Sequence, residues 1–428
     1  MEILWLLSYS LGPLRAHSGS FVALMLTLFG ICLWAYLYCP VNSPRKLALV
    51  LGFALVFRLS LLPAPPDQSE DVYRYLWDGR LSALGMSPYR YAPDAKELES
   101  YRDRRIYPML NSKPYITAYP PLSQGIFHLC YRLFGADVLP MKAVFSLLEF
   151  SALLVAWRLL HAFGAGRQAL LLMAWNPFFI FEFSHSGHSD SSMIFLILLS
   201  LLLMHRSRRI WAAVCYAGAI LAKLHPALWF PLYLRRLGWK ANAAALSILA
   251  LCVPLFFTSE TWLPYLKSLR LYYKLFEFNA GIHYFLRFAG NTLFGQSWDK
   301  LTGPYLGAAL LLITGLIVWR FPVRDSRSLL HAGFWIMTAD LCLATTVHPW
   351  YISWAALALP FFPYAFMMYW TGASFLSYLA YGFQPVREPA WVLLVEYLPM
   401  YALMGWEIYR GSPCLLPRFT ADQTHPPL

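Results

Sequence analysis

The residues best suited to chemistry lie between 69 and 80, in the order Ser-Glu-Asp-Val-Tyr-Arg-Tyr-Leu-Trp-Asp-Gly-Arg. A helix that begins after Ser69 would gather four of them on one face, because residues three and four positions apart are neighbours on a helix surface. These four are Asp71, Arg74, Tyr75 and Asp78. Two carboxylates, a guanidinium and a phenol on one stripe make a polar surface that can hydrogen-bond to a substrate.

The two acids at the start of this stretch, Glu70 and Asp71, have two interpretations. Acidic side chains in a first helical turn stabilise the helix dipole in any protein, and Ser69 is a suitable N-cap. The functional interpretation is that at least one of the acids acts on a substrate. We favour it because both follow directly on an apolar segment, where a membrane-embedded substrate would present its head group.

The stretch belongs to a longer polar segment, 63–119, which holds sixteen of the chain's 56 Asp, Glu, Lys and Arg side chains and eight tyrosines. This segment separates the apolar runs 46–62 and 122–134 and is too long to be only a connector. A single tyrosine there is more typical of a lipid–water interface than of a binding site. The number of tyrosines beside arginines favours binding instead. The further candidates from this segment are Arg80, Tyr89 and Tyr119.

The composition predicts an integral membrane protein. Of the 428 residues, 59% are hydrophobic and only 13% are charged, whereas a typical soluble protein is about 25% charged. Long apolar runs favour helices over the short alternating strands of a membrane β-barrel. We therefore expect an all-α bundle of about eleven to thirteen spans with a large first extracytoplasmic loop that carries short helices. It would form one domain, 1–410, with 63–119 as its catalytic loop and a polar tail over 411–428.

Basic residues predict the topology of this bundle. The net charge of +12 does not indicate nucleic acid, because the cations sit in short clusters at the ends of apolar runs, as the positive-inside rule expects of cytoplasmic loops. Segments between these clusters then face outward. The clusters are Arg45-Lys46, Arg206 to Arg209, Arg235-Arg236, and Arg320 with Arg324 and Arg327.

One segment does not fit this topology. If 122–134 and 143–160 both cross the membrane, Arg167 would lie on the outer side, against its basic character. Either 122–134 is re-entrant or one nearby helix does not span fully. The sequence leaves both options open.

Three short outward elements carry a second group of polar residues. Cations at the membrane boundary suit a phosphate leaving group, because they neutralise the charge that develops on its oxygens. The alternative for each residue is a snorkelling cation or an ordinary interfacial histidine. The candidates are His185, His188, Asp190, Lys223, His348 and Tyr351.

Lys223 is the hardest of these to explain without a function, since it interrupts an apolar run on the side where the positive-inside rule gives a lysine no reason to be. His188 and Asp190 could bind a metal ion, but two residues are too few to predict a metal site. We predict no firm cofactor and leave a divalent cation open.

These motifs together resemble the GT-C glycosyltransferases, and more narrowly the polyprenol-phosphate-mannose-dependent α-mannosyltransferases and related bacterial membrane sugar transferases. The resemblance covers roughly residues 45–360 and is most specific in the first loop. Its motifs are Glu70 to Arg80, Gly85 to Pro93, Tyr119-Pro-Pro, Gly187-His-Ser-Asp, Lys223 and His348-Pro-Trp-Tyr. It implies a multi-span helical fold, a lipid-linked sugar-phosphate donor and an acidic catalytic base in the first loop. Asp71 matches that base, with Glu70 beside it.

We therefore expect an inverting hexosyltransferase, with mannose or another hexose as the sugar. It would move the sugar from a polyprenyl-phosphate donor to a glycan or lipid hydroxyl outside the membrane, and so build a cell-envelope glycan. The expected location is the bacterial inner membrane, with the active site facing outward. A lipid-linked-sugar flippase would place its polar groups at mid-bilayer and show internal repeats, and a non-catalytic assembly protein would not need acids near the start of its loop.

Overall fold

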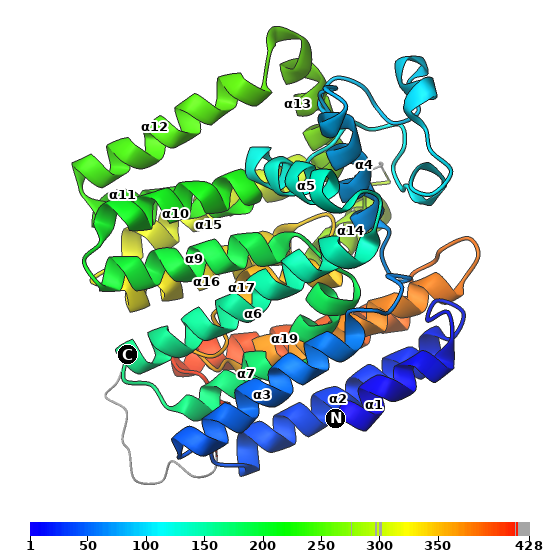
Figure 1. Ribbon diagram of the computed structural model, residues 1–428. Coiled ribbons are helices and arrows are strands. Elements are labelled where there is room, and N and C mark those ends of the chain that lie inside the picture. Colours follow the sequence, from blue (N-terminus) through cyan, green and yellow to red (C-terminus); the bar gives the residue numbers. More distant parts are fainter. Residues whose placement is uncertain (275, 296–297, 299–301, 416, 418–428) are drawn as a thin grey trace.

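The computed structural model describes residues 1–274, 276–295, 298, 302–415 and 417, and its regular elements there are helices. They run roughly side by side (Figure 1). The α-helices are α1 (Glu2–Ser8), α2 (Ser18–Tyr38), α3 (Pro44–Leu61), α4 (Asp71–Ala83), α5 (Pro121–Phe134), α6 (Val138–Ala162), α7 (Leu171–Ala174), α8 (Pro177–Ile180), α9 (Asp190–His205), α10 (Arg209–Ala222), α11 (Phe230–Leu237), α12 (Trp239–Phe256), α13 (Ser259–Lys274), α14 (Gly281–Phe294), α15 (Thr302–Arg320), α16 (Ser326–Leu343), α17 (Ser353–Ala356), α18 (Ala365–Ala373) and α19 (Ala390–Arg410).

Shorter helical segments join these elements. A π-helical turn over Phe181–His185 precedes α9. The 3₁₀ segments are Tyr9–Leu11, Lys96–Tyr101, Tyr107–Met109, Arg167–Leu170, His225–Trp229, Pro349–Ile352 and Ser374–Gly382. The short helices expected in the loop 63–119 are therefore present, as α4 and two 3₁₀ turns.

The all-helical membrane fold predicted from the composition is confirmed. Three helices, α2, α6 and α15, are long and apolar enough to cross a membrane. A bent pair, 239–254 with 259–269, would add a fourth if it forms one span. The count of eleven to thirteen spans stays a prediction, as does the single domain over 1–410. Residues 416 and 418–428 of the expected tail lie outside the described residues.

The helices have two distinct ends. Figure 1 shows the segment 63–119 (blue to cyan) at one end, while the start of α3, the end of α6 and the α9–α10 turn lie at the other. Helix α5 packs beside α4 at the loop end, and its 14 residues span only about 21 Å. Helix α6 then runs from the loop end to the basic end, so Arg167 follows it at the basic end. A helix α5 too short to cross would remove the difficulty over 122–134, which stays a prediction.

Local sequence explains how these helices begin and pack. Pro44 occupies the first turn of α3, and the Ser43 hydroxyl accepts a hydrogen bond from the Lys46 backbone N–H. Inside the bundle, Arg58 of α3 and Glu149 of α6 form a buried bidentate ion pair at 2.5 and 2.7 Å. This pair ties α3, which precedes the first loop, to α6.

Candidate active site

Helix α4 positions Asp71, the acid that the sequence predicts to be the base. It begins at Asp71, one residue later than a helix starting directly after Ser69, and Glu70 is the N-cap residue without a side-chain cap. The Ser69 hydroxyl accepts a hydrogen bond from the Asp71 backbone N–H at 3.3 Å. Asp71 therefore stands in the first turn, where the helix dipole favours a carboxylate.

The Asp71 carboxylate is held by neutral donors. The Tyr119 hydroxyl donates to Oδ2 at 3.2 Å, and the Asn111 side-chain amide donates to Oδ1 at 3.2 Å. His188 Nδ1 lies 3.7 Å from Oδ2, and the Asp71 side chain is 19% exposed. Burial raises the pKa of Asp71, although the two hydrogen bonds and the charge of Lys223 oppose the shift. A raised pKa makes this carboxylate a stronger base than an exposed aspartate.

A cavity of about 380 Å³ opens beside this carboxylate. Its walls come from the start of α4, the loop before α5, the end of α10, and the segment that follows α16. The structure thus brings seven of the predicted site residues to one cavity. They are Glu70, Asp71, Arg74, Tyr119, Lys223, His348 and Tyr351.

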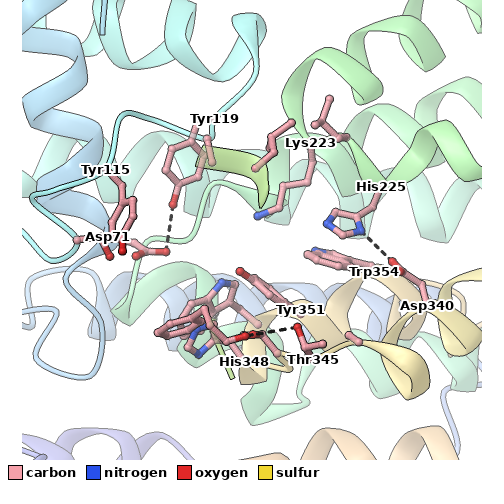
Figure 2. Close-up of a pocket in the computed structure, with 18 of the residues that line it drawn as sticks. Asp71, Tyr115, Tyr119, Lys223, His225, Asp340, Thr345, His348, Tyr351 and Trp354 are labelled. Carbon is pink, nitrogen blue, oxygen red and sulfur yellow. Dashed lines mark hydrogen bonds and ion pairs between the residues drawn. The ribbon is translucent and has the colours of Figure 1, made fainter. Parts of the chain in front are cut away.

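Lys223 extends into this cavity between the Asp71–Tyr119 side and the Tyr351–Trp354 side (Figure 2). Helix α10 ends at Ala222, and the extended backbone of Lys223 turns its side chain away from the helix. Its Nζ lies 3.0 Å from Asp190 Oδ1 and 5.1 and 5.4 Å from the ring centres of Tyr351 and Trp354. The ammonium is therefore fixed by one carboxylate and by cation–π contacts.

Two histidines flank Trp350 in a stack. The rings of His188 and Trp350 lie 3.8 Å apart, and those of Trp350 and His348 lie 4.4 Å apart. Burial lowers the pKa of His348 to about 3 and that of His188 well below its ordinary value, and the charge of Lys223 acts in the same direction. Both imidazoles are therefore neutral at pH 7.

Several buried polar atoms beneath the cavity have no hydrogen-bond partner among the described residues. They include both ring nitrogens of His188, Oδ2 of Asp190 and Nδ1 of His348. Buried polar atoms are usually satisfied, so a local concentration of exceptions is unusual and calls for a partner such as water or a ligand. His188 and Asp190 do not line the cavity themselves, but they contact Trp350 and Lys223, which do.

Two other predicted residues of α4, Tyr75 and Asp78, do not line the cavity. Tyr75 is fully buried and stacks on Phe127 at 4.5 Å. Asp78 accepts hydrogen bonds from Arg74 Nε and from the Gln124 amide, both at 2.9 Å. Both residues therefore hold α4 against α5.

The remaining predicted residues also make contacts outside the cavity. Arg80 donates to the Tyr101 carbonyl and the Tyr131 hydroxyl. The Tyr89 hydroxyl donates to the Tyr119 carbonyl at 2.7 Å, so it supports a residue that does line the cavity. His185 is buried, with Nε2 3.6 Å from Asp67.

Two cavity residues have other partners as well. Glu70 pairs with Arg15 of the segment before α2, which leaves Asp71 as the acid without a cation bound directly to it. Arg74 Nη1 donates to the Tyr115 carbonyl at 3.0 Å, in addition to the Asp78 contact of its Nε. Arg74 therefore orders the loop 110–119 as well as reaching the cavity.

The sequence interpretation missed residues that contribute to the site. Trp354 donates its indole N–H to Asp190 at 2.6 Å. Its ring also lies 3.8 Å from that of His225, whose Nδ1 is 2.8 Å from Asp340. Trp354 lies three residues after Tyr351, and this helical spacing was the signal that the sequence offered. Asn111 gave none, because it lies in an irregular loop whose path only the folded chain shows.

The described part of the chain holds no group of three or more His, Cys, Asp or Glu side chains placed to bind a metal ion. Asp190, which is the nearest acid to Lys223, is already paired with that lysine.

The family model described as "Alpha-(1->6)-mannopyranosyltransferase, N-terminal domain" matches residues 4–237, which is more than half of the chain. The chain belongs to this mannosyltransferase family. No match was found among curated proteins or among solved structures.

The membership makes this protein an enzyme of the glycosyltransferase class and confirms the resemblance noted in the sequence. The matched part of this mannosyltransferase includes Asp71, His188, Asp190 and Lys223. His348, with Tyr351 and Trp354, comes from the chain beyond the match. The cavity is therefore completed by residues from both parts.

Proposed function

We propose that the enzyme transfers mannose from a polyprenyl-phosphate donor to an acceptor hydroxyl, with inversion at the anomeric carbon. The observation that supports this most is that the Asp71 carboxylate and the Lys223 ammonium line the same cavity. A base and a cation in one cavity match the two needs of glycosyl transfer to a hydroxyl from a phosphate leaving group.

Asp71 is the proposed base. Its Oδ2 accepts the proton of the acceptor hydroxyl while that oxygen forms a bond to the anomeric carbon. The bond from that carbon to the phosphate oxygen breaks through an oxocarbenium-like transition state, and the electron pair leaves with the lipid phosphate. Tyr119 and Asn111 hold the carboxylate in place, each through one hydrogen bond. Glu70 is the less suitable base because Arg15 neutralises it.

Lys223 is the proposed partner of the leaving phosphate. Its ammonium is positioned before the substrate arrives, so little reorganisation is needed when negative charge develops. The neutral imidazole of His348 can donate a hydrogen bond to a phosphate oxygen. Arg74 adds positive charge at the cavity wall, although its contacts with Asp78 and Tyr115 restrict it.

An apolar wall of the same cavity supports a lipid donor. Gly303, Leu306, Gly307 and Leu310 of α15 line it, at the spacing of one helix face. Leu343 follows from α16. A polyprenyl chain lies favourably against such a stripe, since burying apolar surface contributes about 25 cal/mol per Å².

The family description supplies the proposed linkage. An alpha-(1->6)-mannopyranosyltransferase forms an α-linkage to a 6-hydroxyl. If the reaction inverts, the donor must carry mannose in the β-configuration. The acceptor is then the 6-hydroxyl of a glycan or lipid of the cell envelope.

The proposed location is the inner membrane of a bacterium, with the cavity facing outward. Basic clusters lie at the end of the helices opposite to the loop 63–119 (Figure 1). The positive-inside rule assigns that basic end to the cytoplasm.

Purified protein in lipid nanodiscs, supplied with β-mannosyl-phosphate polyprenol and a mannoside acceptor, tests the proposal. We expect free polyprenyl phosphate and a mannosylated acceptor to appear together, and a Lys223→Met variant to slow their formation. A flippase would leave the donor chemically intact, which would exclude the transferase mechanism.

A further inference from the structure

A second cavity lies at the basic end of the helices, far from Asp71. Its volume is about 720 Å³, and it sits between the α9–α10 turn and the α11–α12 turn. Three of its residues are cations and two are tryptophans. The residues used below are Arg208, Arg209, Trp211, Gly238, Trp239 and Lys240.

The cations of this cavity have no carboxylate partner in the part of the chain that the structure describes. Arg208, Arg209 and Lys240 are all exposed. The Arg209 side chain extends from the α9–α10 turn to the α11–α12 turn. There its Nη1 would lie only 3.7 Å from a Cβ built on Gly238. Gly238 adopts a φ of +81°, which favours glycine and keeps this approach open.

Two further features favour an anion here. Helices α10 and α12 both begin at this cavity, so two positive dipole ends add to the three cations. The indoles of Trp211 and Trp239 are 61% and 76% exposed, as expected of aromatic side chains at a lipid–water boundary. An anion bound between them would therefore sit at head-group depth.

We propose that this cavity binds the phosphate head group of an anionic phospholipid of the inner leaflet. The two guanidiniums and the ammonium contact the phosphate, while Trp211 and Trp239 flank its glycerol and acyl chains. Basic pockets between membrane helices bind such head groups in other proteins. The function of this site is to anchor the α9–α12 helices to one leaflet, separately from the transfer chemistry.

The test uses the full-length protein and native mass spectrometry. Phosphatidylglycerol is titrated against the detergent-solubilised protein in the presence of excess phosphatidylcholine. The variant Arg208→Gln/Arg209→Gln/Lys240→Gln removes the cavity cations, and we expect its binding to weaken roughly 100-fold. A matched control, Arg45→Gln/Lys46→Gln/Arg324→Gln, removes the same charge from exposed residues at the same end, outside the cavity, and keeps wild-type binding.

An equal loss of lipid binding in both variants would show that net charge alone attracts the lipid. No loss of binding in either variant would place the lipid elsewhere. Both results overturn the proposal. Displacement by millimolar inorganic phosphate would also overturn it, because the site would then be one for free phosphate. Hydrogen–deuterium exchange on the wild type supplies a test that does not depend on the variants. We expect the lipid to protect 206–211 and 237–241, and protection confined to other segments would contradict the assignment.

Discussion

At the scale of single residues, the site depends on the contrast between two adjacent acids. By residue type and position alone, either Glu70 or Asp71 could cap a helix or act as a base, and only the family resemblance favours Asp71. The fold separates them, since Arg15 pairs with Glu70 while Tyr119 and Asn111 donate hydrogen bonds to Asp71. Arg15 lies 55 positions before Glu70 in the chain, so no local sequence pattern could have predicted that the two would form an ion pair.

The raised pKa of Asp71 predicts the acidic limb of the pH profile. A general base must be deprotonated, so kcat/KM should fall as the pH decreases through the pKa of Asp71 in the free enzyme. Burial raises that pKa above its ordinary value, so the limb should lie at higher pH than the titration of a free aspartate near about 3.9. Steady-state rates across pH measure it.

Lys223 supplies the control for this profile. Its positive charge lowers the pKa of Asp71, so the Lys223→Gln variant should shift the limb to still higher pH, in addition to reducing the rate. A limb at the position of a free carboxyl group in both proteins would contradict the assignment of Asp71.

At the scale of elements, the sequence predicted a polar stripe on α4 but not how much of it reaches the cavity. Asp71 and Asp78 are seven residues apart, or about 10.5 Å along the helix. Only the first turn borders the cavity, because Gln124 of α5 covers Asp78. Helix periodicity shows which residues share a face. It does not show where the neighbouring helix crosses that face.

The crossing of α4 and α5 depends on Gly79. A Cβ at this position would lie 2.4 Å from the Phe127 carbonyl oxygen, so Gly79→Ala must push the helices apart. We expect a loss of stability of about 1–3 kcal/mol, seen as a lower Tm. Gly125→Ala on α5 is the control, because a Cβ there meets nothing within 4 Å. Equal Tm values for the two variants would show that the close packing is not needed.

The apolar stripe of α15 can be tested in the same way. Gly307 lines the cavity, and a Cβ there meets nothing within 4 Å. Gly307→Phe should fill the space beside the stripe and raise KM for a long polyprenyl-phosphate donor, with a smaller effect on a short-chain donor. Gly315→Phe is the control on the same helix, at an exposed position that does not line the cavity.

Identical KM changes for long and short donors in Gly307→Phe would contradict a lipid path along this stripe. They would leave the assignment of Asp71 and Lys223 untouched, because that assignment rests on the polar half of the cavity.

At the scale of the whole molecule, composition and charge predicted the helical class and the separation of a basic end from a polar loop end. They could not predict the number of spans, because short and broken helices such as α7, α8 and the π-helical turn interrupt the apolar runs. Nor could they predict that α5, an apolar run in the sequence, would pack beside α4 at the loop end. That arrangement depends on contacts between segments far apart in the chain.

The stability of the helical bundle should depend strongly on the buried Arg58–Glu149 ion pair. The two side chains are 1% and 0% exposed, so Glu149→Gln leaves the guanidinium without its counter-charge. We expect a loss of about 3–5 kcal/mol, measured by thermal unfolding in detergent. Arg90→Gln breaks an exposed ion pair with Glu260 and should cost about 1 kcal/mol or less. Similar losses in the two variants would show that the buried pair does not hold α3 to α6.

The most direct test of Asp71 as the base measures mannosyl transfer from β-mannosyl-phosphate polyprenol by the wild type, Asp71→Asn and Glu70→Gln. NMR gives the anomeric configuration of each product. We expect an α-linked product from the wild type and from Glu70→Gln. Asp71→Asn should fold and bind donor normally but react about 10²–10⁴-fold more slowly, the usual contribution of a positioned base. Wild-type turnover by Asp71→Asn, or a product that retains the β-configuration, would contradict inversion with Asp71 as the base.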